Sequence, residues 1–403
     1  MRIKLRSYAL LAVPAVLLGI LIGVLTANQS PAEPEQSPQE GQGTDFVTTR
    51  AQVERVLLEE PVQLGEHEQT FQQLEVEVEQ GEYEGMRFVV EYGRTSLQPD
   101  DQLFEPGDEL LITIEAYPDG SLYAYFSDAI RTGPLLWLVG GFVLLILLVG
   151  RSKGLRSLII LAASFSVIFL YILPAILDGG NPVWISIIGS IIFLTITQYL
   201  IYGWTLKAHT ALIGMFIAVV ISSFLASLLL DLTSLTGFGT ENALLLRQMG
   251  GDQINLKGLL LSGMIIGTLG VLDDLVIGQV SVVFTIVGAN PGLSLKSLYR
   301  RAMVVGQDHI AATVNTLVLA YVGASLPLLL IFTSFDLPFM LAANREFIIE
   351  EIVRTLVGSS GLVLSVPICT MLAAGIARHA DEILEKAPWL GTPLLTSEHV
   401  HEH

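Results

Sequence analysis

The sequence predicts a membrane protein with an all-α core of about eight transmembrane helices and a small extracytoplasmic β-domain. Composition indicates the helical core: 52% of the 403 residues are hydrophobic and 15% are charged, whereas soluble domains carry about 25% charged residues. A change of pattern indicates the β-domain, because apolar and polar residues alternate within residues 44–131. Residues 27–131 also hold 23 Asp/Glu and five Lys/Arg, while the rest of the chain is balanced in charge.

The first apolar run, residues 8–26, follows three basic residues. It is long for the apolar part of a signal peptide, and Leu25-Thr26-Ala27 is a poor cleavage site. We therefore expect residues 1–26 to form an uncleaved transmembrane anchor with a cytoplasmic N-terminus; a cleaved signal peptide is the alternative. Residues 27–43 are rich in Pro, Gln, Glu and Ser, which predicts a flexible linker.

The acidic β-domain is expected over residues 44–131. Strict alternation at residues 72–79 and turn residues such as Pro106-Gly107-Asp108 and Pro118-Asp119-Gly120 divide it into strands. The five predicted strands cover residues 46–58, 70–80, 84–93, 108–116 and 121–126. Five short strands suit a small β-barrel or sandwich, with an OB-like barrel as one candidate. The acidic residues indicate a soluble exterior, and a surface that collects cations is the second interpretation.

Seven further apolar spans predict a helical core over residues 132–380. They cover residues 134–150, 157–177, 184–203, 210–230, 258–288, 310–332 and 355–377. Most basic loop residues fall on the side of the N-terminus, so that side is expected to be cytoplasmic. Both termini, including a tail over residues 381–403, then lie inside, and the β-domain lies outside a bacterial plasma membrane. Residues 240–249 and 340–354 have mixed apolar and charged faces, which predicts amphipathic helices at a membrane interface.

Asp273 and Asp274 lie midway along the apolar stretch from Gly258 to Val287. A charge inside a bilayer costs at least ~2.5–3.5 kcal/mol, so such residues usually serve a function. As one helix, residues 258–288 would measure ~46 Å against a ~30 Å hydrocarbon core. Glycines around the pair are typical of broken helices at transport sites, and Gln279 and Ser281 add polar atoms. The alternative is a long, closely packed helix whose aspartates pair with a basic residue.

A second polar group opens the span at residues 310–332. Asp308 and Asn315 are seven residues apart and share a helix face, with His309 beside Asp308. His309 is able to relay protons near neutral pH, or it is structural. Asp308 is also a candidate helix cap, and small residues near this group favour close helix packing.

Other chemistry is less well supported. The sequence lacks a Gly-x-Ser-x-Gly, a His-Glu-x-x-His and a Walker loop, and Leu269-Gly270-Val271-Leu272-Asp273 differs from the Gly-x-Gly-Asp of intramembrane aspartyl proteases. We therefore expect no enzyme and no cofactor. The acidic segment argues against nucleic-acid binding, and the single cysteine, Cys369, is expected to be buried and inert. The tail Glu398-His399-Val400-His401-Glu402-His403 is at most a weak metal binder, and the sequence assigns no metal site.

These residues resemble the YibE/F family of bacterial multi-spanning membrane proteins. The resemblance rests on Gly270-Val271-Leu272-Asp273-Asp274 with the Gln279/Ser281 region, and on Gln307-Asp308-His309-Ile310 running into Asn315-Thr316-Leu317. It implies an anchor, an outer β-rich region and a multi-helix core, and a predicted role in transport. Family members often carry Arg before the Asp-His pair, where this chain has Gln307.

Together these observations predict a permease coupled to protons or cations. Two carboxylates in close contact do not easily both ionise in low dielectric, so one would hold an exchangeable proton. Asp273, Asp274, Gln279, Ser281, Asp308, His309 and Asn315 are the predicted pathway residues. The expected partners are the lipid bilayer, a small solute or cation, and an envelope protein or a second copy of the chain. The alternative function is a non-transporting sensor or scaffold whose β-domain binds an envelope partner.

Overall fold

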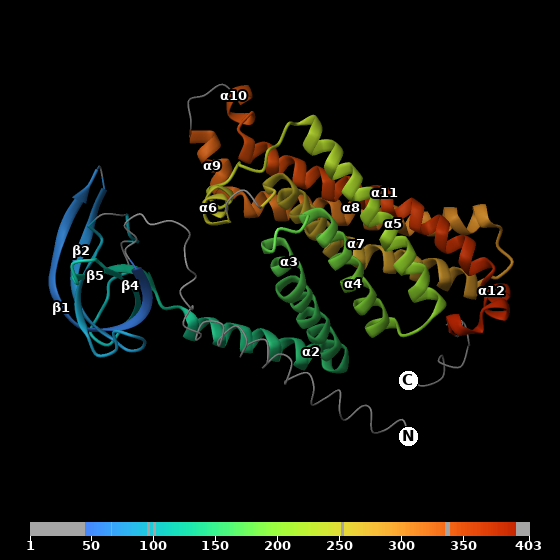
Figure 1. Cartoon of the computed structure of the whole chain (residues 1–403). Coiled ribbons are helices and arrows are strands. Elements are labelled where there is room, and N and C mark those ends of the chain that lie inside the picture. Colours follow the sequence, from blue (N-terminus) through green and yellow to red (C-terminus); the bar gives the residue numbers. More distant parts are fainter. Residues whose placement is uncertain are drawn as a thin grey trace, which may run out of the picture. The chain divides into compact units, whose positions relative to one another are not determined.

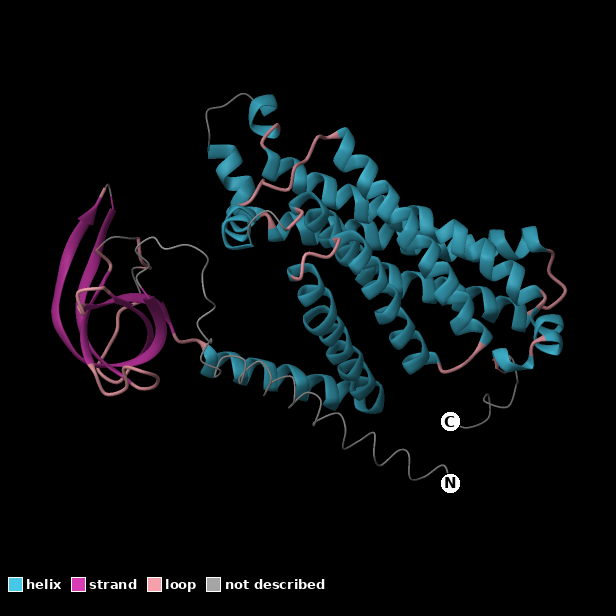
Figure 2. Ribbon diagram, viewed as in Figure 1, coloured by secondary structure: helices cyan, strands magenta, loops and turns pink. Residues whose placement is uncertain are grey.

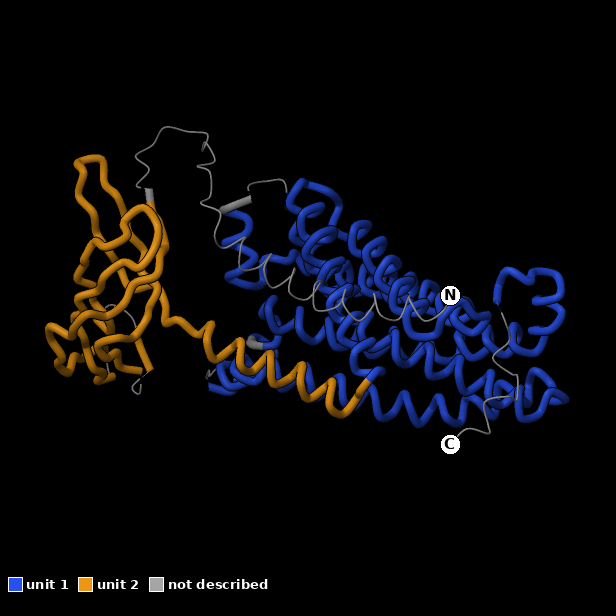
Figure 3. Tube along the Cα trace, turned by 90° about the horizontal axis from the view of Figure 1, so that it is seen from below, with its two compact units in different colours: residues 1–26, 152–403 blue, residues 27–151 orange. Residues whose placement is uncertain are grey.

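A computed structural model describes residues 45–65, 67–94, 97–99, 102–250, 254–334 and 339–391 (Figure 1). The predicted anchor, the linker and the histidines of the tail lie outside these residues. The described chain forms two compact units, one up to residue 151 and one from residue 152 onward (Figure 3). Each unit is described by itself below.

The first unit contains an antiparallel sheet of five strands. They are β1 (Asp45–Leu64), β2 (His67–Val78), β3 (Arg87–Tyr92), β4 (Glu109–Ala116) and β5 (Leu122–Ala129), in the spatial order β3-β2-β1-β4-β5. The predicted alternation is visible in β2, where Leu74, Val76 and Val78 are buried between less buried glutamates. The five predicted strands are thus confirmed, although β1 continues six residues beyond its predicted end.

The sheet is curled into a half-barrel, which replaces the predicted closed barrel or sandwich (Figure 2). Register shifts after Val53 and Val56 mark irregularities in β1, and bulges of this kind increase strand twist. The curl brings the two edge strands together through their aromatic rings: Tyr92 of β3 lies 4.8 Å from Phe126 of β5, between ring centroids, and 5.0 Å from Phe104. This cluster closes the apolar interior of the sheet.

Helices make up the rest of the described chain. They are α2 (Thr132–Val167), the π-helical turn η1 (Ile168–Ile172), α3 (Leu173–Leu177), α4 (Pro182–Tyr202), α5 (Leu206–Leu232), α6 (Glu241–Gly250), α7 (Leu256–Ala289), α8 (Leu295–Ala324), α9 (Leu326–Ser334), α10 (Phe339–Ala343), α11 (Glu346–Arg378), α12 (Ala380–Lys386) and the short 3₁₀ turn η3 (Pro388–Leu390). The π-helical turn precedes Pro174, which lacks an N–H and disturbs the preceding carbonyl ladder.

The prediction of eight spans is wrong. Within the described residues, five helical stretches are long and apolar enough to cross a membrane, at residues 132–177, 182–202, 206–232, 256–289 and 346–378. The predicted spans 134–150 and 157–177 lie in two helices that meet at Arg151, whose φ of 47° and ψ of −128° are non-helical, and the two count together as the stretch 132–177. The predicted span 310–332 is divided between α8 and α9 at Ser325, and α8 carries too many polar residues to qualify.

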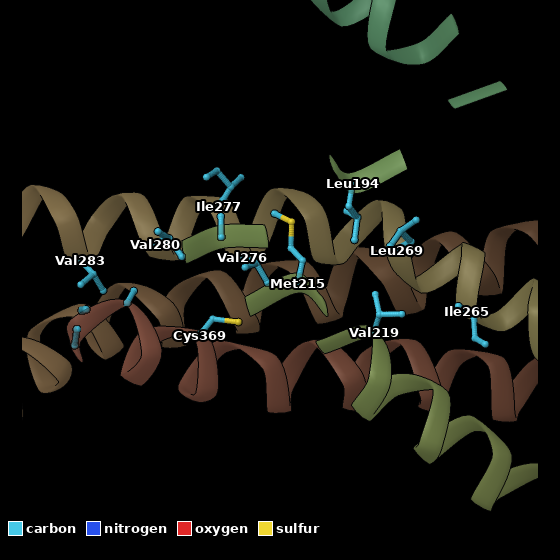
Figure 4. Packing of buried hydrophobic residues seen from close by; sticks show 14 of the residues in the cluster. Leu194, Met215, Val219, Ile265, Leu269, Val276, Ile277, Val280, Val283 and Cys369 are labelled. Carbon is cyan, nitrogen blue, oxygen red and sulfur yellow. The ribbon is translucent and has the colours of Figure 1, made fainter. Parts of the chain in front are cut away.

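The helical core is organised around α7 and α11. Helix α7 packs against α4, α5, α8 and α11, and α11 also packs against α5 and α8. Met215 of α5, Val276 of α7 and Cys369 of α11 lie together in this core (Figure 4). A Cβ atom on Gly214 would lie 2.9 Å from Cys369 Sγ and 3.3 Å from Val276 Cγ1, so a glycine is required where the three helices cross. The thiol is free and buried, as predicted.

The aromatic cluster of the sheet gives the first prediction. Phe104→Ala should destabilise the β-domain by about 3–5 kcal/mol, because it leaves a cavity between β3 and β5. Limited proteolysis of the purified full-length protein should then show faster cleavage within residues 45–129. Phe46→Ala is the matched control, because Phe46 is 73% exposed. Equal protease resistance of both variants would contradict the assigned role of the cluster.

The crossing at Gly214 gives the second prediction. Alanine normally stabilises a helix interior relative to glycine by about 0.5–1 kcal/mol. Gly214→Ala should instead lower stability by about 1–3 kcal/mol, because the added methyl group overpacks the contact with Cys369. Gly375→Ala on α11 should be neutral or stabilising, since its Cβ would meet nothing within 4 Å. Thermal unfolding of the detergent-solubilised variants measures the difference, and a stabilised Gly214→Ala protein would refute the packing argument.

Candidate functional site

Asp273 lies in the middle of α7 and accepts a hydrogen bond from Gln198 of α4. The distance from Gln198 Nε2 to Asp273 Oδ1 is 2.6 Å. Both side chains are buried: 8% of the surface of Asp273 and 0% of the surface of Gln198 are exposed. Asn181 caps the N-terminus of α4 and Pro182 begins the helix, so the sequence fixes where α4 starts. The structure therefore places the predicted aspartate against an amide that comes from a helix 75 residues earlier.

Gln198 is the main partner that the sequence analysis missed. A signal was present, because Gln198 is the one carboxamide or charged residue in the apolar segment 182–202. Its Oε1 atom is buried and has no hydrogen-bond partner within the described chain. An ionised carboxylate is itself only an acceptor. The pair therefore has more buried acceptor sites than donors, which is the arrangement that a proton or a cation would complete.

Asp274 has a different environment from Asp273. Adjacent residues of a helix point about 100° apart, and Asp274 is exposed while Asp273 faces α4. Gly263, Gly267 and Gly270 are also exposed, and their spacing of three and four residues places them on the same face of α7 as Asp274. Thus the two aspartates do not face each other, and Asp274 belongs to a strip of glycines on the surface of α7.

Gln279 joins three helices. Its Nε2 atom donates to the carbonyl of Ala302 in α8 at 2.9 Å and to Thr370 Oγ1 of α11 at 2.8 Å. A Cβ atom on Gly306 would lie 2.9 Å from the same amide, so the glycine allows α8 to approach. Ser281 Oγ donates to the Ile277 carbonyl of its own helix at 2.7 Å. In this geometry Gln279 is a packing junction between helices. Ser281 is half-buried, and its hydroxyl bonds within its own helix.

Asp308, His309 and Asn315 are all exposed on α8. The buried residues of this helix, Leu298, Ala302, Gly306 and Leu317, lie on its packed side. The structure therefore does not bring Asp308 and Asn315 together with Asp273. Helix α8 begins at Leu295 behind the cap residue Ser294, so the interpretation of Asp308 as a helix cap is wrong.

The three polar residues of α8 nevertheless lie at the level of the bundle centre. A Cβ atom on Gly306 would lie 2.8 Å from Val366 of α11, and one on Gly358 of α11 would lie 3.2 Å from Leu317. Helix α8 thus runs antiparallel to α11 across the middle of that span. Asp308 and Asn315 fall between these two contacts.

Two well-formed cavities lie among the described residues of the helical unit, and a predicted pathway residue lines neither of these two. The larger, with a volume of about 420 Å³, is an apolar space between α8, α9 and the start of α11, lined by residues such as Val322, Leu329 and Ile352. The smaller has a volume of about 250 Å³. Within the described residues, no group of three or more His, Cys, Asp or Glu side chains could hold a metal ion.

Five long apolar helices with a buried carboxylate–carboxamide pair define a multi-pass membrane protein. Residues 138–379 match the YibE/F-like protein family, so the chain belongs to this family, and the resemblance seen in the sequence is confirmed. The matched region runs from α2 to the end of α11 and leaves out the β-domain. No curated protein and no solved structure matches the chain.

The junction at Gln279 gives a third prediction. Gln279→Leu should lower the thermal stability of the solubilised protein by about 1–3 kcal/mol, because the Ala302 carbonyl and the Thr370 hydroxyl lose a buried partner. Thr285→Ala is the control on the same helix, since Thr285 is exposed and bonds only to the carbonyl of Ser281 in its own helix. A Gln279→Leu protein as stable as the control would show that the junction does not hold the helices together.

Proposed function

We propose that this protein is a permease of the bacterial plasma membrane, coupled to protons or cations through its intramembrane carboxylates. It acts by binding and release without catalysis. In this proposal Asp273 and Gln198 form the coupling site, both termini lie in the cytoplasm and the β-domain lies outside. The solute is a small molecule or cation that enters the helical unit.

The observation that carries the proposal is the excess of buried acceptors around Asp273. A carboxylate deep in an apolar bundle is costly unless a partner or a proton compensates it. Gln198 supplies one donor at 2.6 Å, and its own Oε1 has no partner within the described chain. A proton or cation that binds here would satisfy the open acceptors, and its release would leave them open again. Such a site suits reversible ion binding.

The glycine strip supports the same function. Asp274 is exposed next to Gly270, where a Cβ atom would meet nothing within 4 Å. A hydrated ion moving along α7 would therefore meet a carboxylate one residue away from the buried site. Asp308, His309 and Asn315 would act on a separate surface of α8, and Gln279 and Ser281 would support the helix rather than bind the ion.

The alternative is a sensor or scaffold whose β-domain binds an envelope protein. One observation favours it: Phe46, Tyr123 and Tyr125 are exposed on one part of the sheet, where Phe46 pairs with Glu115 and Glu115 pairs with Tyr123. Tyr117 Oη donates to Glu115 at 3.0 Å, and this hydrogen bond raises the pKa of Tyr117 to about 12, so its hydroxyl stays protonated. Exposed aromatic residues of this kind are typical of protein interfaces.

Transport is tested in vesicles that contain the purified full-length protein and an internal pH-sensitive dye. Inward gradients of NaCl, KCl, LiCl or NH₄Cl should drive proton movement through the wild-type protein for at least one cation. Asp273→Asn should reduce that movement to the level of protein-free vesicles, because an amide does not bind and release a proton as a carboxylate does. Gln198→Leu should also slow it, while leaving the carboxylate in place.

Thr195→Ala is the control on α4, because Thr195 donates only to the Ile191 carbonyl of its own helix. Circular dichroism and gel filtration confirm that each variant is folded. Unchanged proton movement in folded Asp273→Asn protein would overturn the assignment of the coupling site. The scaffold would instead be supported by two results together. Asp273→Asn would have no effect, and the β-domain would capture a partner that the Tyr123→Ala variant does not capture. Growth of a deletion strain across metals, pH values and solutes would narrow the substrate.

A further inference from the structure

The smaller cavity lies where the loop before α6, α6 itself and the first turns of α7 and α11 meet. Its apolar wall consists of Leu246, Leu256, Leu259 and Leu260. Its polar lining consists of Thr240, Asn242, Glu350 and Arg354. At about 250 Å³ it is large enough for an ion with several waters, since a water occupies about 30 Å³ in the liquid.

Glu350 is the unusual residue in this cavity. Only 4% of its surface is exposed, and its Oε1 atom has no hydrogen-bond partner within the described chain. A Cβ atom on Gly239 would lie 2.6 Å from the same oxygen, so a larger residue at position 239 would displace the carboxylate. A buried carboxylate oxygen without a donor points to a positively charged ligand or a bound proton.

The neighbouring charges are already occupied by other groups. Glu346 accepts hydrogen bonds from Thr236 N and Oγ1, both at 2.7 Å, and from Gly237 N at 3.0 Å. Arg354 lines the cavity but pairs with Glu351, with 3.3 Å between Nε and Oε2. Glu350 is therefore the buried carboxylate that faces the cavity, and it shares the lining with the Arg354 guanidinium, whose Nε is held by Glu351.

Helix α7 links the cavity to the predicted site, because it contributes residues to both. Gly263 lines the cavity and is the first glycine of the exposed strip that continues through Gly267 and Gly270 to Asp274. Eleven residues of helix separate Gly263 from Asp274, a distance of about 16 Å along α7. The strip thus runs from the wall of the cavity to the level of the coupling site.

We propose that the Glu350 cavity is a binding site for a small monovalent cation, from which the ion moves along the glycine strip to Asp274 and Asp273. A monovalent ion is favoured because the cavity offers one carboxylate with neutral oxygens from Thr240 and Asn242. Divalent metals usually recruit more carboxylate or imidazole ligands. The movement toward Asp273 rests on the proposed transport function, whereas binding at Glu350 is independent of it.

The binding test measures the melting temperature of purified full-length protein in detergent. NaCl, KCl, LiCl and NH₄Cl are titrated against N-methyl-D-glucamine chloride at constant ionic strength. At least one small cation should raise the melting temperature of the wild type, because a ligand stabilises the state that binds it. Glu350→Gln should need at least about tenfold more cation for the same shift in melting temperature. This factor corresponds to a loss of about 1.4 kcal/mol of binding free energy. Glu241→Gln, an exposed residue in the first turn of α6, should keep the wild-type response.

The same titration separates this proposal from the proposed function. A shift that survives Asp273→Asn but disappears in Glu350→Gln supports the site, even if the vesicles show no transport. A shift that disappears in Asp273→Asn and survives in Glu350→Gln overturns the site and leaves the coupling site intact. Absence of any cation-specific shift in the wild type also overturns it, and Glu350 then carries a proton.

Two further variants keep the proposal testable if Glu350→Gln does not fold. Thr240→Ala and Asn242→Ala change exposed residues of the cavity lining and should each weaken the cation response several-fold. Gly270→Leu should leave the response unchanged but slow proton movement in the vesicles, because it fills the strip between the cavity and Asp274. An unchanged response in both lining variants would contradict the cation site, and unchanged flux in Gly270→Leu would contradict the route.

Discussion

The hydrogen bond from Gln198 to Asp273 is the interaction on which the helical unit depends. A polar group inside an apolar bundle must find a partner, since an unsatisfied one costs about 1–3 kcal/mol. Two buried polar side chains of α7 bond to neighbouring helices: Asp273 bonds to α4, and Gln279 bonds to α8 and α11. These directed bonds fix which helices surround α7, where dispersion and small residues alone would allow several arrangements.

The acidic groups of this unit differ in how completely the protein satisfies them. Glu346 Oε1 accepts hydrogen bonds from the backbone of Thr236 and Gly237 in the loop after α5, and Glu351 is paired with Arg354. Glu350 and the Asp273–Gln198 pair each keep a buried oxygen without a donor. Gln279 Oε1 is likewise buried without a donor within the described chain, so open acceptors occur at the packing junction as well as at the proposed ion sites.

Much of the fold follows from the sequence, but the tertiary partners do not. Alternation over residues 72–79 predicts β2 because one face of the strand is buried, yet it says nothing about the ring contacts that curl the sheet. Hydropathy predicts apolar segments but not that two of them join through Arg151, because a kink depends on backbone torsions. Asp273 was recognised from its cost in lipid, while Gln198 lies 75 residues away. Periodicity predicts an amphipathic helix over residues 340–354, but it does not show that the loop at Gly239 covers Glu350.

The length of β1 has a consequence for the protein at high local concentration. Beyond the ends of β3 and β4, residues 60–64 of β1 pair only with residues 67–71 of β2, forming an arm roughly 17 Å long with two open edges. Open edges are templates for aggregation. Here Glu60 and Glu68 are exposed along the arm, and Pro61 removes one N–H. Each further arm that tried to add a strand would bring like charges together, so the domain remains dispersed while keeping a long, unprotected strand pair.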